Sequence, residues 1–218
     1  MTAADSSTTD RRPLLRGVLH LVAAGAAVAG IVVLVLLADS AAGYVGGAIF
    51  AACLALLYAT SGLYHVVTWG PRLRDLLKRL DHSTIFLLIA GSYTPFCLAV
   101  LNTAWGISLL AVVWSLAGAG VLLKLVWPGG PRWLSVGLYL GVGWLAAVAA
   151  TELLEWFTLV PLALLVLGGV MYSLGGVVYA ARRPNPFPRF FGYHEVFHAF
   201  VVAGSGLHFL LVAAYVVA

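Results

Sequence analysis

Residues 193–217 read YHEVFHAFVVAGSGLHFLLVAAYVV, an apolar run whose only acidic or imidazole side chains are Glu195, His194, His198 and His208. As an α-helix, this run is long enough to cross a hydrocarbon core roughly 30 Å thick. It opens with a His-Glu-x-x-His pattern, which places two imidazoles one above the other on the same helix face. The stretch therefore predicts a membrane-spanning helix that carries two candidate metal ligands.

Six further apolar runs precede it, at residues 17–38, 44–67, 84–101, 105–126, 133–150 and 157–181. The chain of 218 residues is 62% hydrophobic and only 9% charged, more apolar than the surface of a soluble domain allows. Backbone groups in lipid must be satisfied within their own segment, which favours helices. The sequence thus predicts an all-α membrane protein: a seven-helix transmembrane bundle in one domain, residues 17–218, after a polar and basic tail, residues 1–16.

The charges predict an orientation. All 12 Lys and Arg residues lie in the tail or around the links that follow the second, fourth and sixth runs, whereas the alternate links carry Asp39, Glu152 and Glu155. Basic links remain cytoplasmic, so we expect a cytoplasmic N-terminus and a C-terminus outside. Orientation and contact with anionic lipid explain the net charge of +4, and no nucleic-acid partner is expected.

This topology brings several ionisable groups to one depth. His65 lies at the cytoplasmic end of the second run, Asp81 lies just before the third, and His194 and His198 open the seventh. Ionisable residues in a membrane usually face the bundle interior and mark functional sites. Three neutral imidazoles and a water complete a tetrahedral catalytic zinc site, so His65, His194 and His198 are the predicted ligands.

Asp81 and Ser61 are the candidate catalytic residues. The Asp81 carboxylate can be a fourth ligand, or it can hydrogen-bond the metal-bound water and assist proton transfer. It can also be the N-cap of a helix that begins near Ser83. Ser61 shares a helix face with His65 and can bond a ligand, the water or a substrate oxygen, or bond back to its own helix.

Four other residues are weaker candidates. For His82, which points about 100° away from Asp81 around a helix, a structural hydrogen bond is expected rather than metal ligation. Glu195 can act as a general base or pair with a basic link. His20 is expected at the membrane interface, and His208 is expected to make a buried polar contact too deep to share the metal.

The motifs SGLYH (61–65), DHSTIF (81–86), AGSYTPF (90–96) and YHEVFH (193–198) resemble the bacterial haemolysin III branch of the progestin and adipoQ receptor (PAQR) family. The resemblance covers nearly the whole chain. It implies seven helices with a cytoplasmic N-terminus, in the inner (plasma) membrane. It also implies a zinc ion near the cytoplasmic face, bound by His65, His194 and His198, with Asp81 bearing on the zinc-bound water.

Relatives in the wider family include alkaline ceramidases, and bacterial members are linked to membrane homeostasis. We therefore expect a zinc-dependent hydrolase that acts on an amide or ester bond of a membrane lipid. Two alternatives remain open at this point. One is an intramembrane zinc metalloprotease with Glu195 as base, and the other is a non-enzymatic sensor or haemolysin-type cytolysin with a structural zinc.

Overall fold

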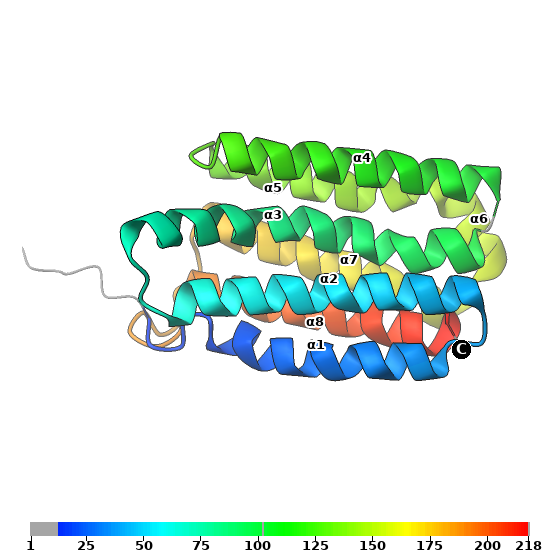
Figure 1. Ribbon diagram of the computed structural model, residues 1–218, viewed down its shortest axis with the longest axis horizontal. Coiled ribbons are helices and arrows are strands. Elements are labelled where there is room, and N and C mark those ends of the chain that lie inside the picture. Colours follow the sequence, from blue (N-terminus) through cyan, green and yellow to red (C-terminus); the bar gives the residue numbers. More distant parts are fainter. Residues whose placement is uncertain (1–12, 102, 218) are drawn as a thin grey trace, which may run out of the picture.

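The computed structural model describes residues 13–101 and 103–217, which form a bundle of seven membrane-length helices aligned along one axis (Figure 1). Within these residues the extended structure is limited to one isolated bridge between Phe187 and Phe191. Each helix is long and apolar enough to cross a membrane. The predicted all-α, seven-helix class is confirmed.

Ten helical segments build the seven spans. The π-helical segment η1 continues α3, and the 3₁₀ segment η2 joins α5 to α6 within one span. The segments are α1 (Val18–Leu37), α2 (Ala41–Val66), α3 (Pro71–Pro95), η1 (Phe96–Val100), α4 (Ala104–Val126), α5 (Arg132–Gly143), η2 (Trp144–Ala149), α6 (Ala150–Trp156), α7 (Leu159–Ala181) and α8 (Tyr193–Tyr215).

The third span begins earlier than the apolar run indicates. It starts at Pro71, whose fixed φ suits the first helical position, whereas the run predicts a start at residue 84. The span is 30 residues long, about 45 Å as a helix, so its first turns project beyond a 30 Å hydrocarbon core and can carry charge. Asp81 therefore lies inside α3, and its interpretation as an N-cap is wrong.

The fifth span also differs from its apolar run. It continues past residue 150 through α6 to Trp156, so Glu152 and Glu155 lie on helix α6 and not in a link. Both acids remain at the end of the bundle opposite the basic links. The charge asymmetry between the two ends is therefore unchanged.

Neighbouring helices in the chain are neighbours in space. Each helix packs against the next in the series α1, α2, α3, α4, α5, α7 and α8. Helix α8 also packs against α1, which closes the ring. The outer faces expose large apolar side chains on every span, as contact with lipid requires. The C-terminus lies at the end where α1 passes into α2, and the Asp39 N–H donates to the Val217 carbonyl there at 3.0 Å (Figure 1).

We call the opposite end of the bundle the basic end, because it carries the start of α1 and the α2–α3, α4–α5 and α7–α8 links. The segment before α1 packs on the last of these links: the backbone N–H groups of Leu14 and Leu15 donate to the carbonyls of Arg189 and Phe190 at 3.1 and 3.2 Å. Residues 13–16 of the predicted tail are thus part of the folded bundle. Residues 1–12 lie outside the described residues.

Candidate metal centre

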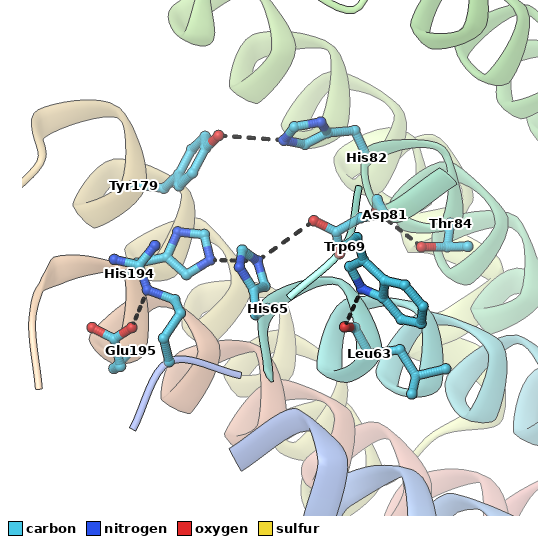
Figure 2. A network of polar contacts seen from close by, with 10 residues as sticks. Leu63, His65, Trp69, Asp81, His82, Thr84, Tyr179, His194 and Glu195 are labelled. Carbon is cyan, nitrogen blue, oxygen red and sulfur yellow. Dashed lines mark hydrogen bonds and ion pairs between the residues drawn. The ribbon is translucent and has the colours of Figure 1, made fainter. Parts of the chain in front are cut away.

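Three histidines meet inside the basic end. His65 comes from the last turn of α2, and His194 and His198 come from the first two turns of α8. One ligand nitrogen from each lies within 4.8 Å of the others, and the Nε2 atoms of His65 and His194 are 3.0 Å apart (Figure 2). Two imidazole nitrogens at this distance, with a third close by, can bind one metal ion.

The start of α8 fixes the direction of its two histidines. The Glu195 carboxylate accepts the Gly192 N–H at 2.7 Å, which satisfies a backbone donor at the helix start. Its other oxygen pairs with Arg16 Nε at 2.5 Å, and only 2% of the Glu195 side chain is exposed. Glu195 therefore anchors the start of α8 to the segment before α1 and points away from the histidines (Figure 2).

Gly17 allows α1 to begin directly against His65. Its φ is +82°, a left-handed conformation that disfavours any side chain. A Cβ atom at this position would stand 2.5 Å from the His65 Cβ and 3.3 Å from the Gly62 carbonyl oxygen. Sequence reasoning missed this residue, although a glycine directly after Arg16, at the start of the first apolar run, was a signal of a special backbone position.

Asp81 and Ser61 flank the histidines from α3 and α2. The Asp81 Oδ2 atom is 3.7 Å from His65 Nε2, too far for a direct hydrogen bond, and the Ser61 hydroxyl lies next to the Asp81 carboxyl group. Both side chains are buried and both line the cavity described below. Among the described residues, the group with mutually close ligand atoms contains the three histidines without Asp81.

His82 faces away from this centre. Its Nε2 lies 3.5 Å from the Tyr179 hydroxyl (Figure 2). Its backbone carbonyl accepts the Tyr139 hydroxyl at 3.1 Å. These are the structural contacts that its position next to Asp81 predicts. The ring of Tyr179 in turn packs against the ring of His194, with centroids 5.9 Å apart.

His20 is buried inside the bundle, a placement that its position near the start of the first apolar run did not predict. Only 2% of the residue is exposed, and its ring stacks on His198 with centroids 3.6 Å apart and planes at 7°. The reason is helix packing: α1 lies against α8, which turns this face of α1 inward. Both ring nitrogens are buried with no hydrogen-bond partner among the described residues, so stacking is the contact that His20 makes with the centre.

His208 lies farther along α8, as its spacing predicts. Its Nε2 donates to the Leu165 carbonyl at 3.1 Å, which is a buried polar contact between α8 and α7. A Cβ atom at Gly168 would stand 2.2 Å from its ring, so a glycine is required where α7 passes it. His208 is separate from the three-histidine group.

A cavity of about 560 Å³ opens beside the histidines and runs inside the bundle. His194, His198 and Asp81 line it at the basic end, and most of the remaining lining is apolar. On α4 its lining reaches from Lys124 to Leu109, about 22 Å along the helix. The candidate metal centre therefore faces a long and largely apolar chamber.

The fold and the centre together define a class: a seven-helix membrane protein with three histidines converging at one end of the bundle. Comparison with known proteins identifies the family. The family model described as "Haemolysin-III related" matches residues 9–209. The chain belongs to the haemolysin III family, the bacterial branch of the PAQR family, and it is a multi-pass protein of the plasma membrane.

Individual relatives agree with this assignment. "Hemolysin-3 homolog" of Bacillus subtilis (strain 168) is 38% identical over 169 residues, which cover 78% of this chain and 76% of that protein. "Hemolysin-3" of Bacillus cereus is 32% identical over 209 residues, 94% and 92% of the two chains. The human "Monocyte to macrophage differentiation factor" is 24% identical over 166 residues, 74% and 66% of the two chains.

Proposed function

We propose that His65, His194 and His198 bind zinc, and that the protein is a zinc-dependent hydrolase of an amide or ester bond in a membrane lipid. The observation that supports this most is that three histidines meet beside a long apolar cavity inside a membrane protein, with His194 and His198 on the cavity wall. A reaction centre in such a place is open to a lipid and largely closed to bulk water.

The donor set fits zinc. Three imidazoles and one open position are a common arrangement in catalytic zinc sites. Zinc–nitrogen bonds of 2.0–2.1 Å in a tetrahedron place ligand nitrogens roughly 3.3 Å apart. The 3.0 Å between the Nε2 atoms of His65 and His194 is near that value. The buried Nδ1 of His198 has no hydrogen-bond partner among the described residues, and the His198 ring lines the cavity.

The neighbouring residues supply proton transfer and orientation. When bound, zinc acts as a Lewis acid and activates a water near neutral pH. Asp81 lies beside the ligand group and outside it, where its carboxylate can accept a proton from the attacking water and return it to the leaving group. Ser61, next to Asp81, can hold that carboxylate or donate to a substrate carbonyl oxygen.

We also propose that the basic end is cytoplasmic. Of the 12 basic residues, all that fall in the described part of the chain lie at this end, which the positive-inside rule assigns to the cytoplasm. The candidate centre then lies just inside the cytoplasmic leaflet, with the N-terminus in the cytoplasm and the C-terminus outside.

The intramembrane protease alternative loses its base, because Glu195 is occupied by Arg16 and Gly192. A cytolysin with a structural zinc is the second candidate, favoured by the names of the two Bacillus relatives. In that case Asp81 has no chemical task. The two candidates therefore differ in what they require of this residue.

Asp81→Asn tests the proposal. Asparagine keeps the shape of the side chain but removes the carboxylate that takes a proton. We expect purified Asp81→Asn to keep about one zinc and to lose roughly 10–100-fold in lipid hydrolysis, measured by mass spectrometry of lipids from reconstituted vesicles. Asp75→Asn, an exposed change of the same kind on the same helix, is the matched control and should behave as wild type.

Each other outcome has a definite meaning. Loss of zinc in Asp81→Asn would make Asp81 a direct ligand. Full zinc with full hydrolysis would refute the role of Asp81, and no hydrolysis by the wild type of any membrane lipid would favour the cytolysin. His198→Ala must lose most of the zinc, because it removes one of three ligands.

A further inference from the structure

Lys124 is a buried cation without an anionic partner among the described residues. It lies near the basic end of α4, is 5% exposed, and lines the same cavity as the histidines. Its Nζ donates to the Ser135 hydroxyl and lies 5.9 Å from the centroid of the Tyr139 ring. A buried charge is expensive unless it is paired, and a hydroxyl and a ring face compensate only part of that cost.

Two more cations line the cavity near this point. Arg132 stands over the rings of Tyr179 and Tyr193, with its guanidinium carbon 5.2 and 5.9 Å from the centroids, and Lys78 comes from α3. All three cations are close enough to His82 to interact with it. In the described part of the chain, the ion pair of a Lys or Arg side chain joins Arg16 to Glu195, so none involves these three residues.

The backbone adds to the positive field at this place. Helix α5 starts at Arg132, and its N-cap residue, Pro131, provides no side-chain acceptor for the first N–H groups. Such N–H groups and the helix dipole favour an anion. Gly129 and Gly130, which precede this start, also line the cavity.

This basic cluster is near the candidate metal centre. Tyr179 contacts both: the Arg132 guanidinium stands over the Tyr179 ring, and the same ring packs against His194 with centroids 5.9 Å apart. Asp81, on the side of the histidines, is the one carboxylate among the described residues that line the cavity. A molecule in the cavity therefore meets cations at the basic end, histidines beside them and apolar side chains beyond.

We propose that Lys78, Lys124 and Arg132 form a subsite for the phosphate of an anionic phospholipid head group, whose acyl chain lies in the apolar part of the cavity. This inference rests on the proposed function, in which a membrane lipid is the substrate. It adds the class of that lipid. A phosphate diester supplies the anion that Lys124 lacks. Apolar lining beyond the cations selects a lipid over a free phosphate ion.

The test is equilibrium binding to the purified full-length protein in neutral detergent. Short-chain phosphatidylglycerol and phosphatidylcholine are titrated separately, and native mass spectrometry measures the bound fraction. We expect the wild type to prefer phosphatidylglycerol. Lys124→Met and Arg132→Gln should each weaken its binding about tenfold, the loss expected for one charge-assisted hydrogen bond, and should weaken the binding of phosphatidylcholine less, because its choline cation offsets the phosphate charge. Arg72→Gln, an exposed change of charge at the same end, is the control and should bind as wild type.

Stability separates a binding role from a structural one. If the role of Lys124 is to bind an anionic ligand, Lys124→Met removes a buried charge that has no ionic partner in the lipid-free protein. The variant should then unfold at the same temperature as the lipid-free wild type or above it. A clear drop in stability, with unchanged preference for phosphatidylglycerol, would make Lys124 a structural residue and overturn the subsite. Arg132→Gln keeps the test decisive if the Lys124 variant fails to fold.

Three further results would be decisive. Equal affinity of both variants and the wild type for phosphatidylglycerol would refute the subsite. Competition by millimolar inorganic phosphate as effective as that by the lipid would refute the lipid assignment. Binding of phosphatidylglycerol that depends on both cations, without hydrolysis of any lipid, would support the subsite and refute the hydrolase.

Discussion

Gly17→Ala is the most direct test of how the chain positions its candidate metal centre. Residue 17 has φ +82°, and the left-handed region costs an L-residue roughly 1–2 kcal/mol. The new Cβ would stand 2.5 Å from the His65 Cβ, whereas carbon atoms pack best at about 3.5–4.0 Å. Either the start of α1 or His65 must therefore move by roughly 1 Å.

The size of the effect follows from these two terms. Overpacking of this kind costs about 1–3 kcal/mol, so with the backbone strain the free energy of unfolding should fall by about 2–5 kcal/mol. For a chain of this length that is a decrease of about 4–20 °C in Tm. Metal sites require ligand distances within about 0.2 Å, so a displaced His65 should also weaken metal binding.

The assay pairs thermal unfolding in detergent with metal content by mass spectrometry. Gly25→Ala is the matched control. Gly25 lies in α1, the helix that Gly17 precedes, and a Cβ there meets nothing within 4 Å. Alanine favours a helix over glycine by about 1 kcal/mol, so this variant should be as stable as the wild type or slightly more stable, with full metal. If Gly17→Ala matched Gly25→Ala in both measurements, the argument that α1 holds His65 in place would be wrong.

Three other predictions concern the surroundings of the centre. Glu195→Gln and Arg16→Gln should each lower stability by about 2–4 kcal/mol and the double variant by less than the sum, with metal retained; additive losses would show that the pair is not coupled. His20→Phe should keep stability and metal, because a phenyl ring can still stack on His198 and has no buried nitrogens without partners. His20→Ala should lower the free energy of unfolding by about 2–4 kcal/mol, and equal behaviour of the two variants would argue against the stacking role. In a background without native cysteines, Asp39→Cys should react with an impermeant thiol reagent in intact cells and Arg74→Cys should not, and the reverse pattern would invert the proposed orientation.

The apolar pattern predicted the number of spans but not all of their ends. Helix starts and stops in lipid follow hydropathy, because backbone groups must bond within the helix wherever lipid surrounds them. Outside the hydrocarbon this rule no longer applies, and a charged segment can be either helix or loop. The early start of α3 at Pro71 and the extension of the fifth span to Trp156 both lie in that region.

The sequence placed the three histidines at one depth, because charge asymmetry and span length together fix the level of each residue. It could not give the rotation of each helix about its axis. That rotation turns Asp81 toward His65, turns Glu195 away toward Arg16, and brings His20 from an expected interface position onto the face of His198.

By itself, then, the sequence determined the class, the number of spans, the distribution of charge and the residues able to hold a metal. Each of these follows from composition and spacing along one chain. The tertiary structure decided which side chains touch: the stack of His20 on His198, the close approach of Gly17 to His65, and the contact of Lys124 with Ser135 on the cavity wall. These contacts join helices distant in sequence, and they depend on the packing of whole surfaces, which no local pattern specifies.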